Sequence, residues 1–188
     1  MRELIIAQMI KVAIIGTSGR NPMDSMRLTA DHMKWMAENV LCYIEHVIKT
    51  TTDNIILISG GSAWADHVAV QLYLSHNFAG LELYLPTDFD VENKKYANTY
   101  EGTMLNLLHS QCKEKINIDV LNELAEAIPK RTTTVVIKRG FLQRNSLVSK
   151  KCDHLICFVF SHIISGGSND TWKKTKHQNK IVFDLSLA

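Results

Sequence analysis

Three segments of this sequence combine glycine with serine or threonine where an apolar run ends: "GTSGRN" from residue 16, "SGGS" from residue 59 and "SGGS" from residue 165. Glycine lets backbone N–H groups approach an anion closely, and the hydroxyls add further donors. A helix that begins after such a segment adds the positive end of its dipole. The three segments together indicate phosphate binding, although a plain turn would explain any one of them taken alone.

The first segment places Gly16, Thr17, Ser18 and Gly19 directly before Arg20. A guanidinium in this position can pair with a phosphate through two parallel hydrogen bonds. The spacing matches neither G-x-G-x-x-G nor the Walker loop, which excludes the standard dinucleotide and triphosphate motifs. A tight turn and a phosphate site of another kind both remain open.

The second segment leads into a predicted helix that starts around Ala63 and carries Asp66 in its first turn. Such an aspartate would stabilise the helix start through the dipole. Arg144 and Asn145 open another predicted helix, which leads into the next strand. A surface arginine is common, so the interest of Arg144 depends on what its neighbours are.

The third segment, Ser165–Ser168, stands before another predicted helix and is followed by Asp170 and Thr171. Its glycine pair, with hydroxyl groups on both sides, is suited to wrapping a phosphate. The basic run from Lys173 to His177 then reads as the solvated face of that helix.

The elements that must position these residues are apolar runs of strand length with helical stretches between them. The runs are continuous rather than alternating, as expected for parallel strands that are covered on both faces. They are Val12–Ile15, Ile55–Ile58, Leu81–Leu85, Leu155–Phe160 and Ile181–Leu185. The alternation predicts an α/β fold, a Rossmann-like doubly wound parallel sheet of about five strands in the order 3-2-1-4-5. In such sheets a ligand binds beyond the carboxyl ends of the strands, where the strand order reverses.

The first predicted helix has one apolar face, and Asp24 or Ser25 would cap it. The residues of that face are Met33, Ala37, Val40, Ile44 and Val47. The second helix has Val68 and Leu72 on one face. The methionines of the first helix (Met26, Met33 and Met36) suit either a core stripe or an oligomer contact.

Residues 87–134 interrupt the alternation of strand and helix. Two helices are predicted in this stretch, Asn98–Lys113 and Asp119–Ile128, so it is interpreted as an insertion that acts as a lid or an oligomer contact. The whole chain, 1–188, is predicted to be a single nucleotide-binding domain that contains this insertion.

Composition bounds the possible classes of protein. The chain has 46% hydrophobic and 21% charged residues, which is typical of a soluble globular protein rather than a disordered one. The net charge of +2 does not require binding to nucleic acid or membrane.

The opening "MRELIIAQMIKVAIIG" lacks a cleavage site and is interpreted as structure, which predicts a cytoplasmic protein. The four cysteines show no C-x-x-C spacing and are expected to be buried reduced thiols, and no metal site is predicted.

The motifs, in this order, resemble the SLOG superfamily of Rossmann-like nucleotide-binding proteins, which includes DNA-processing protein A, the Lonely Guy phosphoribohydrolases and the YspA-like proteins. The resemblance rests on "GTSGR", "ISGGSAWADHVAV", "LELYLP", "FLQRNSLVSKKCDHLICF" and "SGGSNDTW", and covers most of the chain outside residues 87–134. Phe141, Arg144 and Asn145 match the F-x-x-R-N-R motif of the DNA-processing proteins, with Ser146 in place of the last arginine.

The phosphoribohydrolase loop P-G-G-x-G-T-x-x-E is similar around Gly166 and Gly167, and Thr171 fits its threonine after a one-residue insertion. Its catalytic glutamate falls on Lys173 or Lys174, and a lysine cannot stabilise an oxocarbenium-like centre. An acid would then come from elsewhere: Asp170 is nearest, and Asp88, Asp90, Glu92 and Glu101 belong to the insertion. The missing glutamate favours binding without that chemistry.

The resulting expectation is a protein of SLOG type that binds a nucleotide or nucleotide derivative as a sensor or sequestering protein. The alternatives are a nucleoside 5′-monophosphate N-glycosidase, with Arg144 and Asp170 as catalytic residues, and a protein that binds single-stranded DNA. No cofactor is required beyond the nucleotide ligand. The resemblance implies a homo-oligomer, a dimer or a tetramer. The predicted binding residues are Gly16, Thr17, Ser18, Gly19, Arg20, Ser59, Gly60, Gly61, Ser62, Arg144, Asn145, Gly166, Gly167, Ser168 and Thr171.

Overall fold

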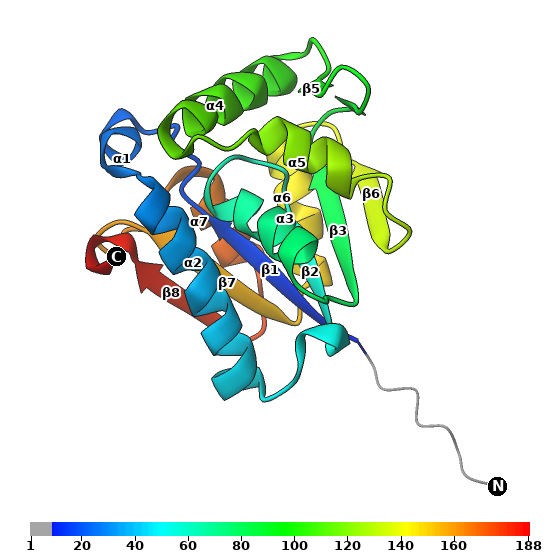
Figure 1. The fold of residues 1–188 in the computed structure, drawn as a ribbon. Coiled ribbons are helices and arrows are strands. Elements are labelled where there is room, and N and C mark those ends of the chain that lie inside the picture. Colours follow the sequence, from blue (N-terminus) through cyan, green and yellow to red (C-terminus); the bar gives the residue numbers. More distant parts are fainter. Residues whose placement is uncertain (1–8) are drawn as a thin grey trace, which may run out of the picture.

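Six parallel strands form one sheet in the order β6-β3-β2-β1-β7-β8 (Figure 1), in a computed structural model that describes residues 9–188. The strands are β1 (Ile10–Gly16), β2 (Ile55–Ser59), β3 (Gly80–Leu85), β6 (Thr133–Ile137), β7 (His154–Val159) and β8 (Lys180–Asp184). The fold is a Rossmann-like α/β fold. The strand order reverses between β1 and β7, where Gly16 lies beside Phe158.

The predicted count of about five strands in the order 3-2-1-4-5 is wrong, because β6 adds a sixth strand outside β3. The five expected strands keep their relative order as β3, β2, β1, β7 and β8. β6 is not predicted because it is a half-exposed edge strand. Its sequence therefore lacks the continuous apolar run from which the other strands are predicted. It begins at Thr133, inside the segment predicted to be an insertion.

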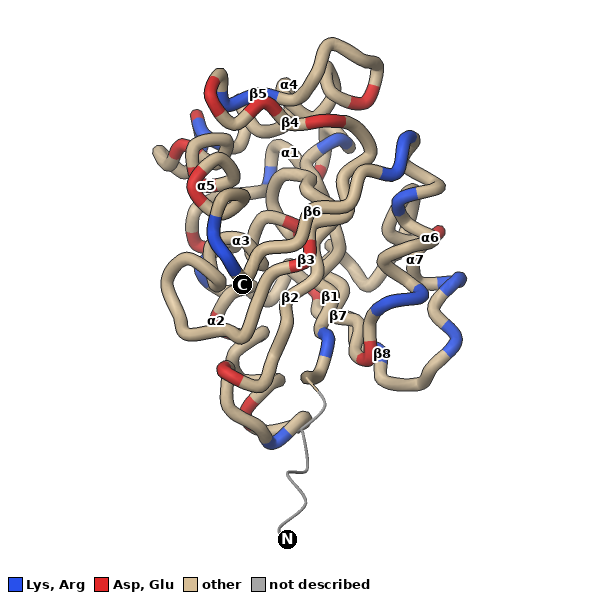
Figure 2. The backbone as a smooth tube through the Cα atoms, turned by 90° about the vertical axis from the view of Figure 1, so that its right-hand side faces the viewer, with Lys and Arg blue, Asp and Glu red and all other residues tan. Residues whose placement is uncertain are grey.

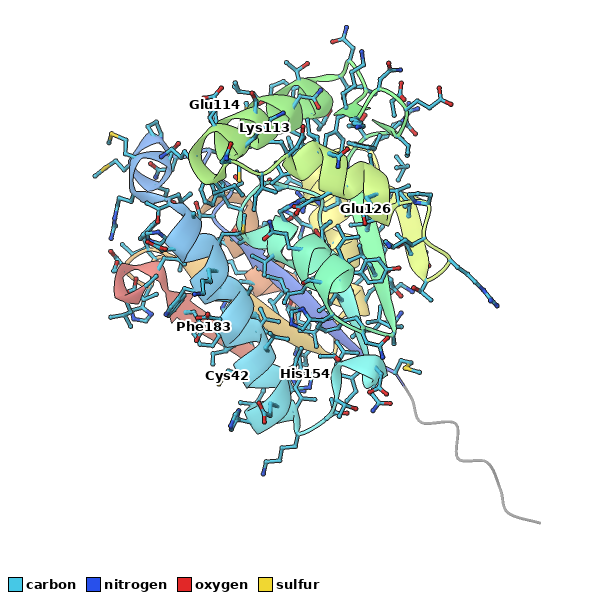
Figure 3. The ribbon with its side chains drawn as sticks, in the orientation of Figure 1. Cys42, Lys113, Glu114, Glu126, His154 and Phe183 are labelled. Carbon is cyan, nitrogen blue, oxygen red and sulfur yellow. The ribbon has the colours of Figure 1, made fainter. Side chains whose placement is uncertain are left out.

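Helices cover both faces of the sheet (Figure 1). α2 (Ala30–Tyr43) and α3 (Ala65–Ser75) lie on one face, and α6 (Phe141–Lys151) and α7 (Gly166–Lys174) lie on the other. The larger core lies under α2 and α3, where Phe183 stacks on Phe158 with ring centroids 5.3 Å apart and meets Trp35 at 6.0 Å. Phe183 of β8 is labelled in Figure 3.

The first predicted helix is in fact two helices, α1 (Pro22–Arg27) and α2. Asp24 and Ser25 are not caps but lie inside α1, which Asn21 caps by accepting a hydrogen bond from the N–H of Met23. Met33 and Met36 belong to the core, whereas Met26 is 75% exposed.

α2 ends in a π-helical turn, Ile44–Ile48. The wider turn shifts the angular positions of the side chains, so Val47 is 56% exposed rather than buried as predicted. A single turn of 3₁₀ helix, Thr52–Asn54, precedes β2, and another, Leu185–Leu187, follows β8.

Of the four cysteines, Cys42 is exposed and the other three are buried. The expectation that all four thiols are buried is therefore wrong for Cys42.

Between β3 and β6 the chain forms the hairpin β4 (Phe89–Asp90) and β5 (Lys95–Tyr96), then α4 (Tyr100–Ile116) and α5 (Val120–Ala127). Thr99 and Asp119 cap the two helices through their side chains. Contact with the helices on the sheet includes a 2.7 Å hydrogen bond between Nε2 of His67 on α3 and Oε2 of Glu123 on α5. Within residues 9–188, every helix is too short or too polar to cross a membrane. Of the opening segment interpreted as structure, residues 1–8 lie outside the described residues, and Ile10–Gly16 forms β1.

Candidate functional site

Two adjoining cavities open at the carboxyl ends of β1 and β7, where the strand order reverses. The central cavity has a volume of about 320 Å³ and the adjoining cavity about 510 Å³. Gly16, Ser18, Arg20, Gly167 and Ser168 line both. The first and third glycine segments therefore meet at one place, although about 150 residues separate them in the chain.

The sheet edge needs glycine at position 16. A Cβ atom there would lie 2.1 Å from the carbonyl oxygen of Phe158 and 2.9 Å from the Cβ of Ala65. α7 contacts the same point, because the hydroxyl of Ser168 donates to the carbonyl of Gly16 at 2.7 Å. The loop after β1 and the start of α7 are thus held together as one wall.

The N-terminus of α7 is free to receive an anion. Ser165 makes no side-chain capping bond, and the first turn contains no acidic residue. The N–H groups of Gly167 and Ser168 sit in the cavity wall without a hydrogen-bond partner among the described residues. Unpaired N–H groups and the helix dipole both favour a negative group at this point.

A buried ion pair forms the floor of the central cavity. Nη1 of Arg144 donates to Oδ2 of Asp66 at 3.1 Å, and the two side chains are only 9% and 7% exposed. Burial raises the pKa of Asp66, while Arg144 and the N–H groups of Ser62 and Gly60 counteract this. Nε of Arg144 has no hydrogen-bond partner among the described residues. Arg144 thus lines the cavity with a guanidinium whose Nε is buried and unpaired.

The second glycine segment supports this pair from behind. Gly61 donates its N–H to the hydroxyl of Ser59 at 3.1 Å, and Ser62 donates its N–H to Asp66 at 3.4 Å. Its N–H groups are therefore used within the protein. Gly60 leaves room for the guanidinium, because a Cβ atom there would lie 1.4 Å from Nη1 of Arg144.

The upper wall of the central cavity is apolar and comes partly from the insertion. Met104 and Leu108, one turn apart on α4, face Phe141 at the start of α6. Arg20 donates to the hydroxyl of Tyr100 at 3.0 Å, which ties the loop after β1 to the start of α4. The cavity therefore has both cationic and apolar lining, and the Cζ atoms of Arg20 and Arg144 each lie 6.0 Å from the centroid of the Phe141 ring.

Asp170, a predicted catalytic residue, is held outside the cavity. Its Oδ2 accepts hydrogen bonds from Lys174 at 2.8 Å and from Asn145 at 3.3 Å. Asn145 also donates to the carbonyl of Gly167 at 3.2 Å, so it links α6 to α7. Asp170 serves in the packing of these helices.

The predicted site residues fall into three groups. Those that line the central cavity are Gly16, Ser18, Arg20, Ser62, Arg144, Asn145, Gly167, Ser168 and Thr171. Those that line only the adjoining cavity are Thr17 and Gly166. Those that line neither are Gly19, Ser59, Gly60, Gly61 and Asp170.

Six further residues that line the central cavity were not predicted as ligand contacts: Ile15, Asp66, Met104, Leu108, Phe141 and Leu142. Asp66 had a signal, since a carboxylate in the apolar stretch "AWADHVAV" needs a cationic partner once it is buried. Met104 and Leu108 carry only the i, i+4 spacing of an apolar helix face, which any packed helix shows.

The comparison with known proteins places the chain in a family. Uncharacterized protein R261 of Acanthamoeba polyphaga mimivirus is 44% identical over 178 residues, which cover 95% of this chain and 97% of that protein. This chain belongs to the R261 family. The match spans both proteins nearly end to end, so the R261 family extends over the sheet and the insertion alike. No protein-family model matches the chain. The name of R261 states no ligand, so the function must be argued from the geometry of the site.

Proposed function

We propose that this protein binds a nucleotide or nucleotide derivative in the central cavity, in a sensor or sequestering role of SLOG type. The observation that carries the proposal is Arg144, whose side chain is 9% exposed and whose Nε lacks a partner among the described residues. A buried donor without a partner is costly unless a ligand satisfies it. Arg144 lines the same cavity as the start of α7, so a ligand there would meet the guanidinium, and a small shift of this side chain would bring Nε within its reach.

The phosphate belongs at the start of α7. The N–H groups of Gly167 and Ser168 would donate to its oxygens, and Arg20 would supply charge from the adjoining loop after β1. Asp66 neutralises much of the charge of Arg144 in the ion pair, so Arg20 is the main free cation of the cavity among the described residues.

The base belongs beneath α4. Met104, Leu108 and Phe141 supply apolar lining that suits a planar ring. The volume of about 320 Å³ is at the small end of the range for ligand pockets, so it suits a compact ligand, and a longer ligand would extend into the adjoining cavity. The insertion therefore acts as the cover of the base site.

The N-glycosidase alternative requires a carboxylate in the cavity, and Asp66 is the one that lines it. Its hydrogen bonds to Arg144 and to the backbone hold it as part of the wall. Binding without cleavage is accordingly the function that this arrangement supports best.

The test is incubation of the full chain with nucleoside mono-, di- and triphosphates, NAD and ADP-ribose, followed by mass spectrometry of retained ligand and free base. We expect an intact nucleotide to be retained. Free base with a sugar phosphate would establish the glycosidase instead, and retention of nothing would overturn the proposal.

We predict that Gly167→Asp weakens nucleotide binding by more than about tenfold. Two like charges about 4 Å apart repel by about 1 to 4 kcal/mol at a protein surface, and about 1.4 kcal/mol corresponds to tenfold. The variant should fold normally, because the added Cβ would be 3.5 Å from Asn145 and an acidic residue suits a helix start. Calorimetric titration measures the change. Asn169→Asp is the matched control, since it adds the same charge to the same helix turn at a residue that lines neither cavity. Equal weakening in both variants would argue against a phosphate at this point.

A further inference from the structure

β6 is the outermost strand of the sheet and faces the viewer in Figure 2. The Thr132 carbonyl accepts from the Leu81 N–H, and Lys138 donates its N–H to Leu85. Because hydrogen bonding alternates along a strand, the even-numbered residues of β6 bond to β3. The N–H and C=O groups of Val135 and Ile137 consequently point outward from the free edge.

The side chains along this edge are suited to pairing with another strand. Val135 and Ile137 are 37% and 36% exposed, and β-branched residues favour extended partners. An open edge of this kind is a template for an added strand unless something protects it. None of the described residues of this chain pairs with it on its outer side.

Basic residues stand at both ends of the strand. Lys130 and Arg131 precede it, and Lys138 and Arg139 follow it. Lys130 lies 3.8 Å from Glu126 of α5, which Figure 3 labels, whereas the other three form no ion pair within residues 9–188. Both ends of the edge are therefore positively charged.

This charge pattern opposes pairing of β6 with a second copy of itself. In a two-fold antiparallel pair centred on Val135, Arg131 of each copy would face Arg139 of the other. Like charges directly opposite each other destabilise a strand pair, whereas opposite charges stabilise it. The charges at this edge therefore disfavour pairing with β6 of a second copy and favour pairing with a strand that has acidic ends.

We propose that the free edge of β6 is a docking site for an extended peptide segment of a partner protein, with β-branched residues in its centre and acidic residues at its ends. Backbone hydrogen bonds to Val135 and Ile137 would supply affinity, and the basic ends would supply selectivity. This proposal is independent of the nucleotide proposal, because no residue of β6 lines the central cavity.

The test uses two fluorescent peptides, "EETVTVTEE" and "KKTVTVTKK", with fluorescence anisotropy at low and moderate salt. We expect the acidic peptide to bind and the basic peptide to bind at least about tenfold more weakly, because several cross-strand charge pairs add up. The variant K138E/R139E should reverse much of this preference. Absence of binding, or equal binding of both peptides, would overturn the proposal.

A second variant tests the edge itself. Val135→Pro removes an outward N–H but none of the bonds to β3, so the sheet should remain intact, as an unfolding curve will verify. It should abolish binding of the acidic peptide, and retained binding would refute docking at this edge. A second copy of this chain could also occupy the edge, and sedimentation of the wild type and the variant tests this. A wild-type dimer that Val135→Pro dissociates would identify the second copy as the occupant and overturn the proposal.

Discussion

Replacing Gly60 with alanine is expected to abolish nucleotide binding and to lower the free energy of unfolding by about 3 to 5 kcal/mol. The added methyl carbon would lie 1.4 Å from Nη1 of Arg144 and 2.6 Å from Oδ2 of Asp66, so the guanidinium must move. Its displacement separates a buried ion pair and leaves an uncompensated charge in the protein interior. Such a loss is a large part of the total stability of an ordinary domain.

Urea unfolding and calorimetric titration measure the two effects. Gly167→Ala is the control for stability, since its Cβ would meet Asn145 at an ordinary 3.5 Å. A double-mutant cycle isolates the cause: in an Arg144→Ala background, Gly60→Ala should cost much less, because the displaced group is already absent. Fully additive costs would show that Gly60 acts in some other way.

The parallel sheet could be predicted because its central strands are buried on both faces. Ile55–Ile58 and Leu155–Phe160 carry continuous apolar runs, and runs of this length bounded by turn residues are typical of buried parallel strands. β6 lies at an edge and exposes Val135 and Ile137. Because it is not buried on both faces, its sequence has no continuous apolar run. The break between α1 and α2 lies at Leu28 and Thr29, whose extended backbone interrupts the helix, and no glycine or proline marks it in the sequence.

The polar half of the site could be predicted because glycine segments at strand ends meet at one sheet edge. The ion pair could not, since Asp66 and Arg144 are 78 residues apart, and the apolar segment around Asp66 indicates a need for a cationic partner without indicating which residue supplies it. The same holds for Met104 and Leu108, whose place over the cavity depends on how the insertion folds back. Contacts between residues that are far apart in the sequence depend on tertiary packing, and the spacing of residues within one segment does not predict them.

Acid should destabilise this protein through His109, a residue of α4 that lies in the core beside His67 and Tyr96. Nδ1 donates to the carbonyl of Leu105 at 2.8 Å, and Nε2 has no partner among the described residues. Burial, assisted by the nearby His67, lowers the pKa of His109 to about 3, and the carbonyl of Leu105 opposes this. In the unfolded chain the pKa is about 6.5. Between these values the unfolded state binds more protons, so stability is fully present above pH 6.5 and falls as the pH drops.

The expected loss is about 1.4 kcal/mol for each pH unit below about 6.5, or about 2.7 kcal/mol at pH 4.5. His109→Leu should remove this slope, since it deletes the titrating ring and the unpaired Nε2 together. Urea unfolding at pH 7.5, 6.5, 5.5 and 4.5 measures the difference between wild type and variant, in which the other titrating groups cancel to first order. Leu105→Met, a buried change on the same helix without a titrating group, should shift the whole curve and leave its slope unchanged. A wild-type slope that persists in His109→Leu would assign the acid sensitivity to other residues. It would also mean that the interior around His109 admits a charged ring far more readily than its burial implies.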